Sequence, residues 1–292
     1  MNYRNQQKIY QEKLIDEGKI FEGVQGNGIF FGKERPFVLK DSMYNLYFQI
    51  RDEVCDYFKK NDISWWRGKK PNGHTLSSQI ACLNHLYLLR NDKQAVLEIA
   101  KTIFQNIDGE AVKIEIDKYF PSYITFEYVN NNKKYLKERY QTRGANCTSI
   151  DAFIKIGNVA IGIEWKYTET DWMNKQSYWN DQEHQNRYKP LLKDSNIKVD
   201  YDKLLSCQMY YELLRQTLLL EQMQKNGEIA NYKNVVVCPK GNKKLFECCT
   251  KWKEYLKDET KYEVIDPKDL LANINQEKYN DLLKYLSQRY QH

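Results

Sequence analysis

Two carboxylates and a lysine lie on what the sequence predicts to be a single β-hairpin. Two runs of alternating apolar residues flank the dipeptide Gly157-Asn158, which has the residue types of a two-residue hairpin turn. With this turn, Asp151 on the first strand lies directly opposite Glu164 on the second. Because side chains alternate with a period of two, Lys166 shares the face of Glu164. The pattern therefore predicts an acidic pair and a cation side by side at the open end of the hairpin.

Opposed carboxylates are an unfavourable choice for a hairpin that binds no ligand. Like charges directly across a strand pair destabilise it. At ~5 Å and an effective dielectric constant of about 20, Coulomb's law gives roughly 3 kcal/mol of repulsion. A bound divalent cation would remove this repulsion, because hard cations bind carboxylate oxygens. The alternative is a hairpin with one face in the core and the other in water, which needs no cation.

The two faces of the predicted hairpin differ in composition. One face is apolar throughout and consists of Ile150, Ala152, Ile154, Ile156, Val159, Ile161, Ile163 and Trp165. The face of the carboxylates also carries Phe153, Lys155 and two small residues, Ala160 and Gly162. These small residues predict room for a bulky molecule above the sheet.

The rest of the chain must supply the elements that hold this hairpin. Hydrophobic periodicity predicts helices at 5–17, 41–60, 74–92 and 94–106 in the first part of the chain. Strands follow at 124–129, 149–156 and 159–167. The rest of the chain is predicted to contain a helix at 204–224, a strand at 235–238, a helix at 245–256, a strand at 262–265 and a terminal helix. Helices on either side of a run of strands are typical of a mixed α/β fold. We expect an N-terminal extension of loops and helices over 1–74, packed on a core formed by 75–292.

Composition limits the class of protein. The chain has 292 residues, a net charge of +6 and 41% hydrophobic residues, which is enough for a buried core. No apolar run approaches the roughly 18 residues that suggest a membrane span, and the N-terminus has no apolar signal segment. The seven cysteines include no CxxC pair. This pattern disfavours a zinc or iron–sulfur site and fits a reducing, cytoplasmic compartment. The positive charge is compatible with a polyanionic partner.

The spacing of the acidic pair and the lysine matches a known signature. The segments S-I-D-A around Asp151 and G-I-E-W-K around Lys166 resemble the signature of the PD-(D/E)xK nuclease superfamily, with Ile150 where proline is usual. Further stretches are similar to a family of bacterial restriction endonucleases within that superfamily, namely Trp65-Trp66, HTLSSQIACLNHLYLLR, RGANCTSIDAF, IGIEWKYTE and YYELLRQTLLLEQ. The resemblance covers most of residues 20–270.

This resemblance implies a fold, a reaction and a cofactor. The implied fold is the restriction-endonuclease-like αβββαβ core, a mixed central sheet flanked by helices, over residues 75–240. The implied reaction is hydrolysis of phosphodiester bonds in double-stranded DNA with Mg²⁺, for which Mn²⁺ would substitute. Asp151, Glu164 and the main-chain carbonyl of Trp165 would hold the metal, and Lys166 would orient or help deprotonate the attacking water. Cleavage of two strands would suit a homodimer.

The helix that follows the hairpin offers three supporting candidates. The resemblance implies that a Gln and a Tyr lie beside the site, and Gln208 and Tyr211 come near this pattern without its usual four-residue spacing. Arg215 shares a helix face with Gln208 and Glu212 and would contact a phosphate. The alternative for this face is a solvated polar stripe.

Earlier elements offer three more candidates. Ser78 and Gln79 lie in the helix that would open the implied core, and such a helix often approaches the metal site. The alternative is that Ser77 or Ser78 only caps this helix. Glu127, in the strand before the hairpin, is either a further acidic ligand or an exposed strand residue.

Other polar groups allow several roles. Aromatic and basic residues are mixed in the segment 171–203, namely Trp172, Tyr178, Trp179, His184, Arg187, Tyr188 and Lys189. Such mixing suits contact with nucleic acid, although irregular packing is the alternative. The patch Arg67–Lys70 is a solvated turn by default, and His74 and His85 are expected at surface or packing positions.

Three other functions remain open. A repair nuclease or exonuclease would use the same fold and chemistry. A non-catalytic nucleic-acid-binding protein would keep the fold, although the intact Asp, Glu and Lys argue against a decayed site. A glycosidase that uses a carboxylate pair is disfavoured by the adjacent lysine.

Overall fold

A mixed five-stranded sheet lies at the centre of the fold. The computed structural model describes residues 1–66, 68–132, 134–139, 142–169, 181–198 and 207–291, and the strand order of this sheet is β3-β4-β5-β6-β7. The antiparallel strands are β3 (Ile124–Tyr128), β4 (Ile150–Ile156) and β5 (Val159–Trp165), and β6 (Asn231–Val237) and β7 (Tyr262–Ile265) continue from β5 in parallel. This sheet and its helices confirm the predicted α/β class.

The β4–β5 hairpin has the predicted register. Its strands pair regularly from the turn as far as Ala152 and Ile163. Just beyond this last pair, the main-chain N–H of Trp165 donates to Asp151 Oδ2 at 2.7 Å. A carboxylate thus accepts from β5 at the point where the ladder ends, and this bond ties Asp151 to the strand that carries Glu164.

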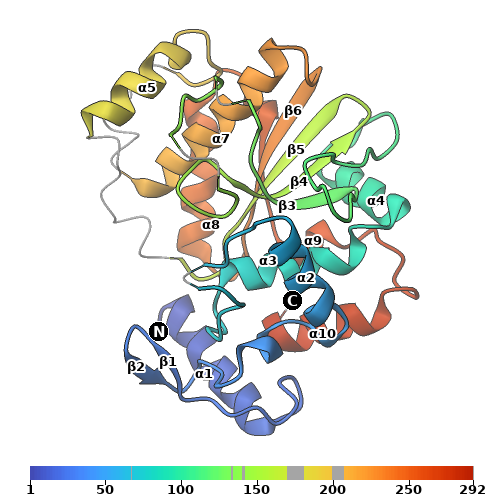
Figure 1. The fold of residues 1–292 in the computed structure, drawn as a ribbon. Coiled ribbons are helices and arrows are strands. Elements are labelled where there is room, and N and C mark those ends of the chain that lie inside the picture. The colour runs from blue at the N-terminus through green and yellow to red at the C-terminus, as the bar shows by residue number, and fades with distance from the viewer. Residues whose placement is uncertain (67, 133, 140–141, 170–180, 199–206, 292) are drawn as a thin grey trace.

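Helices cover both faces of this sheet (Figure 1). α3 (Ser78–Leu86) packs against β4 and β5, and α4 (Lys93–Ile103) against β4. On the other face, α7 (Gln208–Lys225) packs against β5 and β6, and α8 (Lys243–Thr250) against β7. Each face has its own cluster of buried apolar side chains, so the sheet is the middle layer of three.

The face beneath α7 corrects two predictions. Ile150 does not share the face of Ala152; it packs in the cluster beneath α7. A Cβ atom on Gly162 would lie 3.2 Å from Ile150 Cδ1 and 3.3 Å from Leu220 Cδ1, so the space above this glycine belongs to the core and not to a bulky ligand. Simple alternation fails here because β4 passes Glu127, whose φ of 49° breaks the regular geometry of β3.

The N-terminal part lies beside the sheet and its helices (Figure 1). It contains α1 (Tyr3–Glu17), the short hairpin of β1 (Gly28–Phe30) and β2 (Lys33–Arg35), the 3-10 turns Ser42–Asn45 and Phe48–Ile50, and α2 (Arg51–Lys60). The helix predicted over 41–60 therefore begins later than its apolar pattern indicates. A long-range bond is one reason, because the Tyr47 N–H donates to Asn84 Oδ1 at 2.8 Å and not to a carbonyl of its own turn.

The C-terminal helix α10 (Asn280–Tyr290) holds α1 in place. Gln11 Nε2 donates to the Arg289 carbonyl at 2.9 Å, and the buried Arg289 guanidinium contacts Gln11 and Asn45. The remaining elements are the helices α5 (Gln182–Leu192) and α9 (Pro267–Leu270) and the 3-10 turns Tyr87–Leu89, Lys251–Tyr255 and Glu259–Lys261. No helix within the described ranges is long and apolar enough to span a bilayer. A domain boundary after residue 74 stays a prediction.

Candidate active site

A cleft of about 430 Å³ opens at the end of the β4–β5 hairpin that lies away from its turn. Seven of the predicted residues line it, namely Ser78, Gln79, Glu127, Asp151, Glu164, Lys166 and Arg215. The strands supply the acidic residues and the lysine, while α3 and α7 supply polar side chains from the two sides. The N-terminal extension supplies aromatic residues. The cleft therefore brings together parts of the chain that are far apart in sequence.

Three carboxylates lie on neighbouring strands of this cleft. Glu127 and Asp151 lie between the pairs Phe126–Ala152 and Tyr128–Ile150 of β3 and β4. Asp151 and Glu164 lie one position beyond the last pair of β4 and β5, which joins Ala152 and Ile163. Glu127 is buried, so it is not the exposed strand residue of the alternative reading. Burial raises the pKa of all three carboxyls, and the charges of Glu164 and Glu127 raise that of Asp151 further. The site therefore disfavours three full negative charges unless a cation joins them.

Lys166 is held between two carboxylates. Its Nζ lies 2.6 Å from Glu164 Oε1 and 3.0 Å from Glu212 Oε2. Burial alone would lower the pKa of Lys166, but the charges of Glu164 and Glu212 outweigh it and raise the pKa well above the ordinary value. The ammonium group therefore stays protonated at neutral pH, and it serves to position Glu164 and to supply positive charge.

The oxygen donors of the cleft suit a hard divalent cation. Throughout the described ranges, no three His, Cys, Asp or Glu side chains already form a set that could hold a metal ion. Mg²⁺ does not need such a set, because it usually binds through one or two carboxylates and keeps several waters or phosphate oxygens. Asp151 and Glu164 provide those two carboxylates. Burial and neighbouring carboxylate charges raise the pKa of both groups, and a bound cation would offset this unfavourable negative charge. The residues present therefore fit a magnesium ion.

The α7 helix contributes a different set of residues from the one expected. Glu212, Arg215 and Gln216 line the cleft, whereas Gln208 and Tyr211 do not. Gln216 Nε2 donates to Glu164 Oε2 and to the Ser149 carbonyl, so it orients the carboxylate. Sequence reasoning misses Gln216, although its four-residue spacing from Glu212 is a usable signal. Tyr211 supports the site indirectly, since the Arg215 guanidinium lies 5.0 Å above its ring.

The start of α3 reaches the same carboxylates from the opposite side. Ser77 caps the helix by accepting from the Ile80 N–H, which leaves Ser78 and Gln79 to face the cleft. Gln79 Nε2 donates to Glu127 Oε1 at 2.6 Å, and Gln79 Oε1 accepts from the Trp66 N–H at 2.9 Å. One amide thus links the carboxylates to the N-terminal extension.

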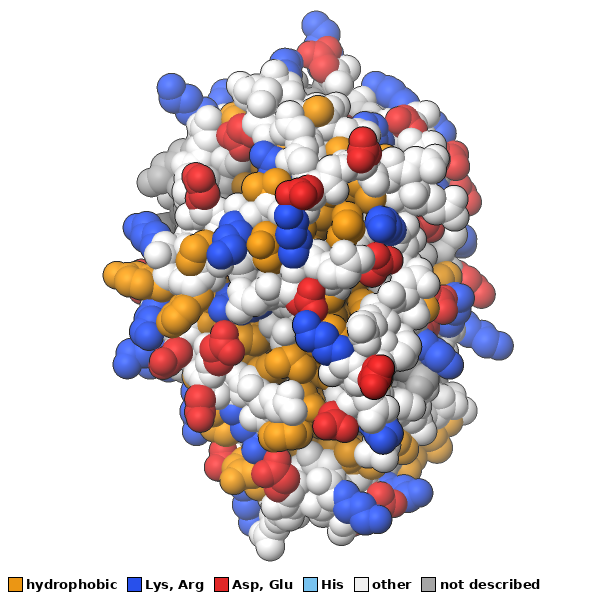
Figure 2. All heavy atoms as spheres, turned by 90° about the vertical axis from the view of Figure 1, so that its right-hand side faces the viewer, with side chains coloured by type: hydrophobic (Ala, Val, Ile, Leu, Met, Phe, Trp, Pro, Cys, Tyr) orange, Lys and Arg blue, Asp and Glu red, His pale blue; other side chains and the backbone are white. Residues whose placement is uncertain are grey.

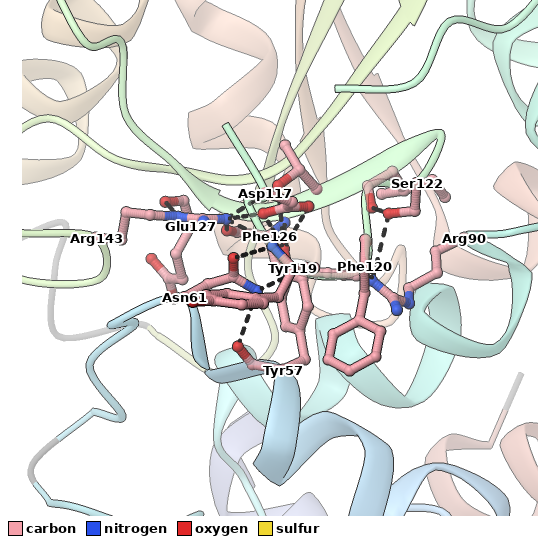
Figure 3. A network of polar contacts seen from close by, with 12 residues as sticks. Tyr57, Asn61, Arg90, Asp117, Tyr119, Phe120, Ser122, Phe126, Glu127 and Arg143 are labelled. Atoms are coloured by element: carbon pink, nitrogen blue, oxygen red, sulfur yellow. Dashed lines mark hydrogen bonds and ion pairs between the residues drawn. The ribbon is translucent and has the colours of Figure 1, made fainter. Parts of the chain in front are cut away.

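A buried ion-pair network fixes the main chain at Glu127 (Figure 3). Arg143 donates to the carbonyls of Phe126 at 2.6 Å and Glu127 at 3.2 Å. Its other contacts are an ion pair with Asp117 at 2.9 Å and a bond to the hydroxyl of Tyr57, which itself donates to Asp117. These contacts hold Glu127 at a positive φ that a non-glycine residue rarely adopts.

The chain matches the model of a protein family described as restriction endonuclease associating with ARP, over residues 6–291. The chain belongs to this family. No curated protein and no solved structure is recognisably similar to it. The family match includes the N-terminal extension as well as the sheet, which agrees with the finding that both parts line one cleft.

The remaining predicted groups take structural positions or lie outside the described residues. His85 is buried against Trp165, with 4.7 Å between ring centroids, and is a packing residue. The Trp165 side chain points into the core on the α3 face, and its carbonyl stays a predicted metal ligand. His184 stacks on Tyr211 with 5.7 Å between centroids, and Tyr188 is buried, with its ring centroid 6.4 Å from that of His184. The positions outside the described residues are Arg67, Trp172, Tyr178 and Trp179.

Proposed function

We propose that this member of the restriction endonuclease family is a Mg²⁺-dependent DNA endonuclease of PD-(D/E)xK type. The observation that carries the proposal is the pairing of Asp151 and Glu164 across one hairpin, with Lys166 held 2.6 Å from Glu164 in the same cleft. The family match supports the reaction class. Mn²⁺ would substitute for Mg²⁺, and double-stranded DNA is the expected substrate. A homodimer and a cytoplasmic location stay predictions.

The element order supports the same assignment. Helices α3 and α4 precede the antiparallel strands β3, β4 and β5, and α7 then leads to the parallel strand β6. This order is compatible with the αβββαβ core that the resemblance implies for residues 75–240. Asp151 lies on β4, Glu164 on β5, and Lys166 directly after β5, an arrangement that supports the resemblance to the signature.

The proposed chemistry follows from how each side chain is held. Asp151 and Glu164 would bind Mg²⁺, with the Trp165 carbonyl as a further ligand. A bound Mg²⁺ would polarise the scissile phosphate and lower the pKa of a coordinated water. Gln216 would keep Glu164 oriented toward the metal by its hydrogen bond. Lys166, as a protonated group, would offset the negative charge that develops on the phosphate.

Nicking of supercoiled plasmid tests this proposal. We expect cleavage with Mg²⁺ or Mn²⁺ and none with EDTA. Lys166→Ala and Glu164→Ala should each lower the rate by roughly 10³-fold, which is typical of removing one group that stabilises charge in the transition state. The matched control is Lys155→Ala, because Lys155 lies on the same hairpin but outside the cleft and donates to the Glu228 carbonyl.

The outcomes separate the competing functions. Cleavage that survives both Lys166→Ala and Glu164→Ala would contradict the site assignment. Digestion of linear DNA without nicking of closed circles would indicate an exonuclease. Metal-independent binding without any cleavage would indicate a non-catalytic binding protein.

A further inference from the structure

Four rings from the N-terminal extension form one wall of the catalytic cleft. They belong to Phe30, Phe31, Trp66 and His74. Phe30 lies at the centre of the cluster, with its ring centroid 4.7 Å from Phe31, 5.6 Å from Trp66 and 4.6 Å from His74. The two outer rings face solvent, since Phe31 is 64% and Trp66 40% exposed. Large apolar side chains at this exposure add little to folding, so their clustering at a cleft indicates a ligand.

The backbone conformation at the tip of the β1–β2 hairpin also indicates a contact with a ligand. The turn residues are Phe31 and Gly32, with φ of 54° and 68°. Two-residue turns with positive φ at both positions favour Asn, Asp or Gly, and a bulky residue there costs free energy. The tip thus carries an aromatic side chain at a conformational cost and leaves it exposed. Such a choice is typical of a residue kept for contact with a ligand.

A second groove, of about 980 Å³, adjoins the cleft across this wall. Phe30 and Phe31 line both spaces. Among the described residues, Lys40, Lys69 and Lys70 also line the groove, against one acidic residue, Glu34. By contrast, acidic and basic side chains are interspersed on the side of the molecule that carries α4 (Figure 2).

Three further cations act on the His74 ring of this wall. Burial, together with the charges of Arg4, Lys8 and Arg35, lowers the pKa of His74 to about 4. The His74 ring is therefore neutral at pH 7 and adds a flat aromatic surface among cations. Aromatic rings set within a basic groove are the arrangement that binds single-stranded nucleic acid, because bases stack on the rings and cations neutralise the phosphates.

The wall is also close to the proposed reaction centre. Gln79 accepts from the main chain of Trp66 and donates to Glu127, which lines the same cleft as Asp151. Two hydrogen bonds through one side chain therefore separate the aromatic wall from the carboxylates. A base on Phe31 or Trp66 would belong to a nucleotide near the phosphate in the cleft.

We propose that Phe31 and Trp66 stack on an unpaired base of the DNA strand in the cleft, and that the adjoining lysine-lined groove takes the neighbouring phosphates. This proposal rests on the proposed function for the identity of the ligand. It adds that a base next to the phosphate in the cleft would leave the base stack and contact these rings when the DNA is bound.

Binding to strands of equal charge tests this proposal without any cleavage. The full chain is titrated in EDTA into a fluorescein-labelled oligothymidine and into an equally long strand of abasic sites, and anisotropy gives both dissociation constants. We expect the oligothymidine to bind about ten-fold more tightly, which is typical of stacking on aromatic side chains. Phe31→Ala and Trp66→Ala should remove most of this preference and leave the affinity for the abasic strand within about two-fold.

A control separates stacking from general effects. Phe48→Ala removes an aromatic ring that is 57% exposed but lines neither the cleft nor the groove, and it should keep the preference. If an alanine variant fails to fold, Phe31→Leu or Trp66→Leu replaces it in the same measurement, because leucine keeps an apolar side chain but removes the aromatic ring. Equal binding of both strands by the unaltered protein, or variants that weaken both strands alike, would overturn the proposal. Base preference without Mg²⁺-dependent cleavage would refute only the proposed function, and cleavage without base preference would refute only the stacking site.

Discussion

Two hairpins meet at the same cleft and contribute to it in opposite ways. The β4–β5 hairpin has seven residues in each strand, is covered on both faces, and places its functional groups at its open end. The β1–β2 hairpin has three residues in each strand and presents its aromatic side chain at the turn. The first hairpin is part of the core, whereas the second lies at the surface.

The difference follows from what each kind of group needs. Carboxylates that share a metal must be held in a fixed geometry, and only dense packing and hydrogen bonds can hold them against their mutual repulsion. A stacking ring needs an accessible face and tolerates small movements. A covered strand end therefore suits the acidic pair, and an exposed turn suits the aromatic side chain.

The largest effect on stability is expected in the buried network next to the β4–β5 hairpin. Arg143→Met leaves the Asp117 carboxylate, which is fully buried, without its cation. We expect a loss of about 3–5 kcal/mol in the free energy of unfolding, the usual cost of breaking a buried ion pair from one side. Urea unfolding followed by circular dichroism measures it.

An exposed ion pair gives the control for this variant. Lys13→Met breaks the pair between Lys13 and Glu17 on α1, both of them well exposed, and should change stability by less than about 0.5 kcal/mol. The double variant Arg143→Met/Asp117→Asn should recover part of the loss. Equal effects of Arg143→Met and Lys13→Met would show that the main chain at Glu127 does not depend on this network.

A smaller change in stability, a gain and not a loss, is expected from a substitution at the carboxylates of the cleft. The folded state raises the pKa of Asp151, Glu127 and Glu164 above their ordinary values of 3.8 and 4.5. It therefore binds more protons than the unfolded chain above about pH 4, and metal-free stability falls as the pH rises through this window. Asp151→Asn removes one of the three charges and keeps an acceptor for the Trp165 N–H.

We expect Asp151→Asn to raise the free energy of unfolding in EDTA at pH 7 by up to about 1 kcal/mol, the usual size of a cross-strand charge effect. The gain should shrink toward zero at about pH 4, where the native carboxyl is neutral as well. Thermal unfolding at several pH values measures both, and plasmid nicking should be lost. A lower melting temperature at pH 7 would contradict the repulsion that we infer.

The smallest effects are expected at the two turns. Gly157 has a φ of 52° and no atom closer than 3.7 Å to the place of a Cβ, so Gly157→Ala should cost about 1 kcal/mol through backbone conformation alone. Phe31→Gly should leave stability unchanged or raise it by up to about 1 kcal/mol, because it relieves the same conformation and removes an exposed ring. Urea titration measures both, and a clear loss from Phe31→Gly would show that the ring supports the fold.

Local chemistry made the placement of the three central candidate residues predictable from sequence. The turn at Gly157-Asn158 and the two-residue period of the strands determine that Asp151 faces Glu164 and that Lys166 joins them. These features act between neighbours in sequence or across one short hairpin. For the same reason the positions of α1, α4, α7 and the sheet strands other than β6 were close to their predicted ranges, whereas β6 begins at Asn231, four residues before its predicted start.

Other features depended on contacts that no local pattern contains. Gln216 orients Glu164 from a separate helix, and the β1–β2 hairpin reaches the cleft from the far end of the chain. Ile150 leaves its expected face where Arg143 and its partners hold Glu127 at positive φ. The sequence alone thus determined which residues could do chemistry and how one hairpin pairs them. Only the tertiary structure decided what surrounds that pair, because packing between distant segments can override alternation and place side chains that sequence spacing does not relate.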